Sequence, residues 1–311
     1  MSVTPLRVSS KFFVCGIPIN GDSYRGCPFG CEYCFANNRV ISKNQNDEVA
    51  NISQLEKTMK RIFDEKEINN TNFLDVLIKN KITWHYGTLS DPFQPIERKY
   101  NITRRVIELS NIYDTSILFS TKSNQIDNFD VLNPNNHTFQ FSISNICDRK
   151  DIEPGVPSIE SRIKLYRELK DRGFRVGIRI QPFIPGVSGT DIIDAFPDAD
   201  NFTIEALKLV PQNQEQQKKM LDLIDQPRSN FVQKGLLRLK PDIRTLLYQP
   251  LIDRMNDNDI SWSIADSDMH TMGKNKCCCG DALVKKSTDF NNTALYKKYR
   301  KKESSAYAPQ R

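Results

Sequence analysis

The chain has 311 residues, of which 38% are hydrophobic and 26% are charged. This composition is that of an ordinary globular protein, and it excludes a disordered chain, a collagen-like fibre and a small disulfide scaffold. A length near 300 suits two domains or one α/β barrel. No apolar run approaches the ~20 residues that span a bilayer, and the N-terminus lacks the apolar stretch and cleavage site of a signal peptide. We therefore expect a cytoplasmic protein.

The net charge of +6 lies entirely in the C-terminal tail. Residues 285–311 contain eight Lys or Arg against two acidic residues, so the preceding 284 residues sum to zero. The densest part is Lys297–Lys302, where Tyr299 interrupts the basic run. Such a tail is either a solvated, mobile end or a segment attracted to a polyanion such as DNA or RNA.

Segments of strand and helix character alternate along the chain to about residue 265. The expected strands are Lys11–Ile17, Lys81–Gly87, Ser116–Ser120, Thr138–Ser144, Arg175–Gln181, Phe202–Leu207 and Ile260–Ala265. The expected amphipathic helices are Asn51–Glu65, Thr103–Ile112, Ser158–Arg172, Gln214–Ile224 and Asp242–Asn256. Regular β–α alternation implies right-handed crossovers and a parallel sheet. We predict one domain over residues 1–265, followed by a short extension over residues 266–311 that contains cysteines and the basic tail.

Several of the expected strands are polar on one face. In Arg175–Gln181, for example, Arg179 and Gln181 share a face opposite Ile178 and Ile180. Strands that helices cover, and the core of a closed barrel, are usually apolar, and burying unpaired polar groups costs several kcal/mol each. An antiparallel sheet with one wetted face is the alternative, but the helices between the strands argue against it. We predict an α/β fold of partial (β/α)6 TIM-type barrel architecture, whose open interior holds a large polar ligand.

Three of the eight cysteines, Cys27, Cys31 and Cys34, form a C-x3-C-x2-C motif with Tyr33 before the last cysteine. Zinc sites favour paired C-x2-C units and a fourth Cys or His, and none is close in sequence. Iron–sulfur clusters prefer thiolates, and three thiolates on one loop leave one iron of a cubane open to a reactant. The motif follows the first expected strand, where barrels of this kind place their chemistry. It therefore favours a [4Fe-4S] cluster over a zinc knuckle or three buried structural cysteines.

The C-x3-C-x-aromatic-C motif resembles the signature of the radical SAM superfamily. The resemblance implies a [4Fe-4S] cluster on Cys27, Cys31 and Cys34, whose fourth iron is chelated by S-adenosylmethionine (SAM). It further implies that one electron, from a reductase or a flavodoxin- or ferredoxin-type donor, cleaves SAM to methionine and a 5′-deoxyadenosyl radical. This radical abstracts hydrogen from the substrate.

Further segments resemble the spore photoproduct lyase-like branch of that superfamily, in the same order, from about Lys11 to Leu209. They are Gly87–Glu97, Ser120–Ser123, Phe141–Ser144, Glu153–Arg162 and Val176–Gly186. The resemblance implies that Ser90 and Asp91 lie beside the amino group of SAM, and that Lys122 and Ser142 reach its carboxylate and ribose. Tyr33 would present its backbone to the adenine, and Arg179 and Gln181 are plausible further contacts.

The branch resemblance also implies a nucleic acid or nucleotide substrate, in a repair or modification reaction. Two alternatives remain open at this point. One is a radical SAM enzyme that acts on a peptide or a small molecule. The other is a non-enzymatic nucleic-acid-binding module that cysteines or a metal stabilise.

The sequence departs from the branch in its cysteines and in one loop. The usual Gly-Gly-Glu is absent beside Ser90. Spore photoproduct lyase donates hydrogen from a cysteine between the cluster loop and the next strand, but here no cysteine lies between Cys34 and Cys147.

The chain instead carries the consecutive residues Cys277, Cys278 and Cys279. We expect this triplet near the open mouth of the barrel, either as a hydrogen donor or as a second metal site that Cys15 or His270 completes. Buried structural cysteine is the alternative reading, since free Cys packs as a small hydrophobe.

Overall fold

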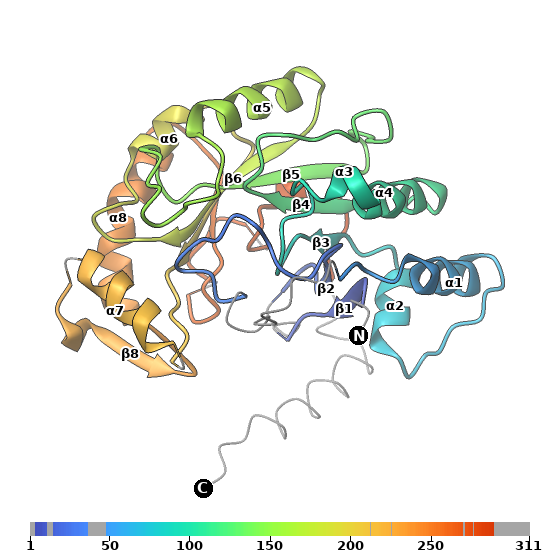
Figure 1. Cartoon of the computed structure of the whole chain (residues 1–311), viewed down its shortest axis with the longest axis horizontal. Coiled ribbons are helices and arrows are strands. Elements are labelled where there is room, and N and C mark those ends of the chain that lie inside the picture. Colours follow the sequence, from blue (N-terminus) through green and yellow to red (C-terminus); the bar gives the residue numbers. More distant parts are fainter. Residues whose placement is uncertain are drawn as a thin grey trace, which may run out of the picture.

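A curved, mostly parallel sheet organises the computed structural model (Figure 1). The structure describes residues 4–10, 15–36, 48–211, 213–224, 226–269, 271–275 and 277–288. In the order in which they lie side by side, the strands are β1 (Leu6–Val8), β2 (Ile19–Gly21), β3 (Trp84–Tyr86), β4 (Ile117–Thr121), β5 (His137–Ser142), β6 (Val176–Phe183), β7 (Phe202–Ala206) and β10 (Trp262–Ile264). Every pairing from β2 to β10 is parallel, and β1 joins β2 antiparallel. Within the described ranges β1 and β10 remain unjoined edges, so the predicted partial barrel is confirmed.

Helices follow most of the strands and cover the outer face of the sheet (Figure 1). They are α1 (Ile52–Phe63), α2 (Phe73–Lys79), α3 (Glu97–Tyr100), α4 (Ile102–Ile112), α5 (Ile159–Asp171), α6 (Asp191–Ala195), α7 (Gln214–Leu223) and α8 (Pro241–Asp257). Side-chain caps fix two of the predicted starts: Asn51 accepts from the Gln54 amide at 3.1 Å, and Ser158 accepts from the Ser161 amide at 3.3 Å. A short antiparallel hairpin, β8 (Phe231–Lys234) and β9 (Leu236–Leu239), lies between α7 and α8. No helix among the described residues is both long enough and apolar enough to cross a membrane.

The alternation along each strand sorts apolar from polar side chains as the sequence predicts. Phe119, Phe141 and Ile178 are fully buried in the main core, which the outer helices share. On the opposite, inner face, His85 on β3 contacts Ser120 on β4, with 2.8 Å between Nε2 and Oγ. The interior of the barrel is therefore lined by polar groups that bond across strands.

The first expected strand is placed wrongly by the sequence. The parallel sheet begins at β2, and within the expected segment Lys11–Ile17 the described residues Cys15–Ile17 are not in a strand; residues 11–14 lie outside the described ranges. Ile17 is fully buried, but against Leu118, Cys277 and Leu283. At its described end, the segment therefore packs against β4 and the C-terminal segment and does not form a strand of the sheet.

That C-terminal segment, Asn275–Thr288, enters the barrel from the amino-terminal ends of the strands. Thr138 at the start of β5 donates its hydroxyl to the Leu283 carbonyl at 2.7 Å, and the Thr83 amide just before β3 donates to the Lys286 carbonyl at 2.9 Å. The sequence analysis predicted that the polar inner face of the barrel contacts a large polar ligand along its whole length. The structure shows that the chain itself satisfies the amino-terminal half of that face.

Candidate active site

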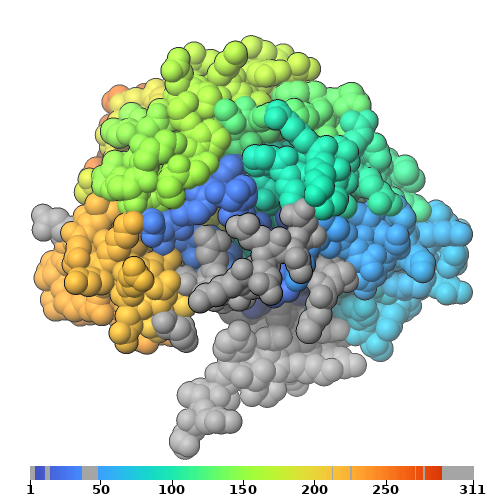
Figure 2. Space-filling view, viewed as in Figure 1, coloured from blue at the N-terminus to red at the C-terminus, as the bar shows by residue number. Residues whose placement is uncertain are grey.

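The loop that carries Cys27, Cys31 and Cys34 leaves the carboxyl end of β2 and is held on both sides. The Glu32 amide donates to the Ile152 carbonyl, and the Gly155 amide donates to the Phe29 carbonyl, each at 2.9 Å. A Cβ at Gly155 would lie 2.6 Å from the Pro28 carbonyl oxygen, so the two backbones approach as closely as only glycine allows. In the space-filling view the blue residues that follow β2 lie on the near face, between green segments and the orange α7 (Figure 2).

The three sulfur atoms of the motif do not all lie within 4.8 Å of one another. Cys31 is buried, whereas Cys27 and Cys34 are partly exposed. One tetrahedral zinc with bonds of about 2.3 Å would hold its sulfurs about 3.8 Å apart. Among the described residues, one group of three donors has all its ligand atoms within 4.8 Å of one another. That group is Cys277, Cys278 and Cys279, not the motif cysteines. A cubane binds each thiolate to a different iron, so the more widely spread donor set of this loop fits it.

Asp91 follows β3 and is fully engaged in fixing the end of β4. Its carboxylate accepts from the Phe93 amide at 2.9 Å, from the Thr121 hydroxyl at 2.9 and 3.0 Å, and from the Lys122 amide at 2.7 Å. Burial raises the pKa of the Asp91 carboxyl to about 6, against these hydrogen bonds. Ser90 is likewise committed, since its hydroxyl donates to the Tyr24 carbonyl at 2.7 Å. Asp91 therefore positions Phe93, Thr121 and Lys122, and Ser90 is held by the Tyr24 carbonyl.

Lys122, directly after β4, points into a buried polar group beside the cysteine loop. Its Nζ lies 2.8 Å from Glu153 Oε1 and 3.1 Å from the Ser142 carbonyl oxygen, and it sits over the ring of Tyr33, 5.4 Å from the centroid. The Tyr33 hydroxyl donates to the same Glu153 oxygen. The aromatic residue of the cysteine motif is thus joined through one carboxylate to the lysine at the end of β4.

Glu153 and Arg162 are site residues that sequence reasoning left unassigned. Both are almost fully buried, and Arg162 donates to the Ser142 carbonyl at 3.4 Å. Burial alone disfavours ionisation of Glu153, but the charges of Lys122 and Arg162 outweigh it and lower the pKa of this carboxyl to about 2. The sequence offered only the resemblance of the whole Glu153–Arg162 segment to the branch, which does not single out these two residues.

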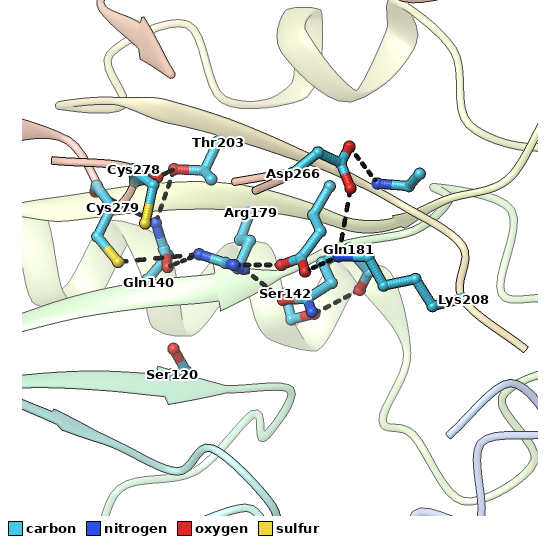
Figure 3. Close-up of polar contacts among 12 residues, drawn as sticks. Ser120, Gln140, Ser142, Arg179, Gln181, Thr203, Lys208, Asp266, Cys278 and Cys279 are labelled. Atoms are coloured by element: carbon cyan, nitrogen blue, oxygen red, sulfur yellow. Dashed lines mark hydrogen bonds and ion pairs between the residues drawn. The ribbon is translucent and has the colours of Figure 1, made fainter. Parts of the chain in front are cut away.

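A second polar group lies deeper in the barrel, around Arg179 on β6 (Figure 3). Arg179 donates to Gln181 Oε1, pairs with Glu205, and lies 3.2 Å from Gln140 Oε1. Its Nη1 is also 3.9 Å from the sulfur of Cys279. Arg179 therefore connects the strand face that was predicted to bind a ligand with the cysteine triplet.

Ser142 joins the two polar groups. Its hydroxyl donates to the Gln181 carbonyl at 2.7 Å, while its own carbonyl accepts from Lys122. On the far side of Arg179, Lys208 pairs with Glu205 and lies 3.2 Å from Asp266. The structure thus brings Tyr33, Lys122, Ser142, Gln181 and Arg179 into one connected network.

The cysteine triplet is not at the mouth where the sequence led us to expect it. The Cys278 carbonyl accepts from the hydroxyls of Thr203 and Ser263, both at 3.1 Å, and the Cys279 carbonyl accepts from Gln140 at 3.3 Å. These contacts hold the triplet on the amino-terminal side of Arg179 (Figure 3), whereas the cysteine loop lies at the carboxyl ends. The physical reason is that the backbone carbonyls of the triplet satisfy polar groups of the inner face.

No protein-family model matches the chain. An uncharacterized protein of Methanocaldococcus jannaschii (MJ0683) is 28% identical over 179 residues, which is 56% of this chain and 61% of that protein. The chain therefore spans less than two-thirds of the length of this relative.

Solved structures of spore photoproduct lyase share the fold. A variant with bound AdoMet and a dinucleoside spore photoproduct matches with a TM-score of 0.59 and 17% identity, covering 83% of this chain and 80% of that one. The enzyme complexed with the dinucleoside photoproduct matches with a TM-score of 0.56 and 16% identity, covering 80% and 75%. The relationship that the sequence motifs predicted is confirmed at the level of the fold.

Proposed function

We propose that the chain is a radical SAM enzyme that acts on a nucleic acid or a nucleotide. The observation that carries this proposal is the hydrogen-bonded path from Tyr33, inside the cysteine motif, through Glu153 to Lys122. It joins the loop that would hold the cluster to the cation that would hold a carboxylate. Three thiols on one loop can bind three irons of a cluster, and the partly buried Lys122 beside them can attract the carboxylate of a chelated SAM.

Each residue of the site has a separate role in this proposal. Cys27, Cys31 and Cys34 would bind the cluster, and Lys122 would attract the carboxylate of SAM. Glu153 would hold the ammonium group of Lys122 in position. When bound, the cluster supplies one electron, received from an external reductase, that cleaves SAM into methionine and a 5′-deoxyadenosyl radical able to take hydrogen from the substrate. Asp91 is a positioning residue, because its carboxylate accepts from the Lys122 amide and so fixes the backbone of that lysine.

Two features support a nucleic acid or nucleotide as the substrate. Spore photoproduct lyase, whose fold this chain shares, has been solved with a dinucleoside photoproduct. The tail, residues 289–311, lies outside the described residues, but its sequence carries much of the positive charge that phosphate binding uses.

The direct test is an anaerobic assay of SAM cleavage. The chain is reconstituted with iron and sulfide, reduced with dithionite and given SAM together with DNA, RNA, nucleotides or peptides. We expect a brown protein that forms 5′-deoxyadenosine, with the yield raised by one of the nucleic acid substrates. A colourless protein that binds zinc at the motif and leaves SAM intact would contradict the proposal and support a binding module.

Replacing Lys122 with Met is expected to weaken SAM binding about ten- to hundred-fold, because a charge-assisted hydrogen bond contributes about 1.5–3 kcal/mol. The measurement is SAM affinity by anaerobic equilibrium dialysis, with iron content as the check on cluster assembly. Lys170→Met is the matched control, since Lys170 pairs with Asp200 at 2.9 Å on the outer helix α5. Equal SAM affinity in the two variants would contradict the proposal that Lys122 binds the carboxylate of SAM.

Deleting residues 291–311 is expected to weaken oligonucleotide binding and to flatten its salt dependence. Each lost phosphate contact should reduce the slope of log affinity against log salt by about 0.7–0.9. Single-stranded oligonucleotides should bind better than duplexes, since a stacked base must leave the helix before it can enter a barrel. The check is fluorescence anisotropy across a salt series, and an unchanged slope would make the tail a solvated end.

A further inference from the structure

Four cysteines from opposite ends of the sequence meet in the amino-terminal half of the barrel. The sulfur atoms of Cys277, Cys278 and Cys279 all lie within 4.8 Å of one another. Cys15 packs against the buried cluster that contains Cys277 and Cys279. A Cβ at Gly16 would lie 3.4 Å from the Cys277 sulfur, so the N-terminal segment packs directly against the triplet. The result is a triplet of close sulfur atoms with a fourth cysteine, Cys15, packed beside it.

The turn that presents the triplet is held in place by groups outside it. The Gly280 amide donates to the Cys277 carbonyl at 2.9 Å, and Gly280 has a φ of +91°, which favours glycine. A Cβ at Gly280 would lie 2.4 Å from the side chain of Asn201. The Cys277 amide donates to Asp281 Oδ1 at 2.9 Å. The three consecutive side chains are therefore turned toward a common point by the backbone around them.

Disulfides between neighbouring cysteines of the triplet are disfavoured. Adjacent Cα atoms are about 3.8 Å apart, below the range of about 4.4–6.8 Å that disulfides usually span. Neither neighbouring pair within the triplet is therefore well placed to bond. A tetrahedral ion with four thiolates, in contrast, needs sulfurs about 3.8 Å apart, and all three sulfurs of the triplet lie within 4.8 Å.

One buried cation, Arg179, lies close enough to offset part of the charge of such a site, and it also pairs with Glu205. Zinc with four thiolates has a net charge of about −2, which is costly to bury without a cation nearby. Arg179 Nη1 lies 3.9 Å from the Cys279 sulfur. Arg179 is itself buried, so little solvent screens the attraction.

We propose that Cys15, Cys277, Cys278 and Cys279 bind one structural zinc ion, separate from the motif cysteines. The ion joins the N-terminal segment to the C-terminal segment where the Thr288 amide already donates to the Gly16 carbonyl at 2.7 Å. Its ligands are all thiolates, a donor set that selects zinc or iron over harder cations. The site does not depend on SAM chemistry at Cys27, Cys31 and Cys34.

The first test is metal analysis of the full chain, purified anaerobically and supplied with Zn²⁺. We expect about one zinc per chain in the wild type and also in the variant with Cys27, Cys31 and Cys34 all changed to Ala. The double change Cys278→Ser with Cys279→Ser should lose the zinc and keep the iron of the motif. Cys147→Ser, at an exposed cysteine, is the control that should keep both metals.

The second test uses Co²⁺ as a spectroscopic probe in the iron-free Cys27/Cys31/Cys34→Ala variant. We expect the intense visible bands of tetrahedral cobalt with four thiolates, and a shift to shorter wavelength in the variant that also carries Cys15→Ser. Zinc retained after the Cys278/Cys279 change, cobalt bands insensitive to Cys15, or iron in place of zinc at the triplet would each overturn the proposal. Two disulfides found by thiol counting in the denatured protein would do so as well.

Discussion

Changing Cys27, Cys31 and Cys34 together to Ala is expected to abolish motif-bound iron and the cleavage of SAM. The three thiols lie on one loop within the described residues, and the loop is fixed by backbone bonds to Ile152 and Gly155 rather than by the metal alone. The scaffold should therefore survive the change, while the cluster loses all three of its protein ligands. The measurements are iron content, visible absorbance and 5′-deoxyadenosine formation under reducing conditions.

The control for this variant is Cys147→Ala, at an exposed cysteine outside both thiol groups. It should retain iron and SAM cleavage at wild-type levels. Thermal melting of both proteins separates loss of the cluster from loss of the fold. Full iron loading in the triple variant would refute the assignment of the cluster to this loop.

Changing Arg244 to Met is expected to destabilise the protein by about 3–5 kcal/mol, because it leaves part of a buried ion pair without its partner. Arg244 on α8 is fully buried and lies 3.2 Å from Asp266 and 2.7 Å from Asp268. Asp266 is also fully buried, and it accepts from the Tyr248 hydroxyl at 2.8 Å and from the Ala206 amide at 3.1 Å. The loss should appear as a lower urea midpoint in anaerobic unfolding.

Arg254→Met on the same helix is the matched control. Arg254 pairs with Asp194 at 2.7 Å, but both side chains are about half exposed, at 48% and 50%. An ion pair in that setting contributes at most about 1 kcal/mol. If the two variants shifted the midpoint equally, burial of the Arg244 pair would have no energetic consequence, contrary to our account.

Periodicity predicted much of the sheet because the strands from β3 onward bury one apolar face against helices. The inner polar face of β6 was correctly read from Arg179 and Gln181 for the same reason. Periodicity failed at Lys11–Ile17, since an apolar run does not reveal whether it is buried by a sheet or by another segment. Ile17 is buried by residues more than a hundred positions away in the sequence.

The roles of individual site residues were harder to predict than their location. The branch resemblance implied that Asp91 lies beside the amino group of SAM, but only the structure shows that its carboxylate accepts from Phe93, Thr121 and Lys122. Glu153 could not be selected from sequence, because its importance comes from contacts with Tyr33 and Lys122 across distant elements. Such pairings depend on tertiary distances, which spacing along one segment does not encode.

The threading of Asn275–Thr288 into the barrel has a consequence for the order in which the protein is made. Synthesis runs from the N-terminus, so Gly16 leaves the ribosome long before Thr288, to which its carbonyl is bonded. Until then, Thr83, Thr138 and Thr203 lack the partners that they have in the finished barrel. A chain cut short before residue 277 would leave these groups without those partners, so this part of the interior is completed only after residues 277–288 have been made.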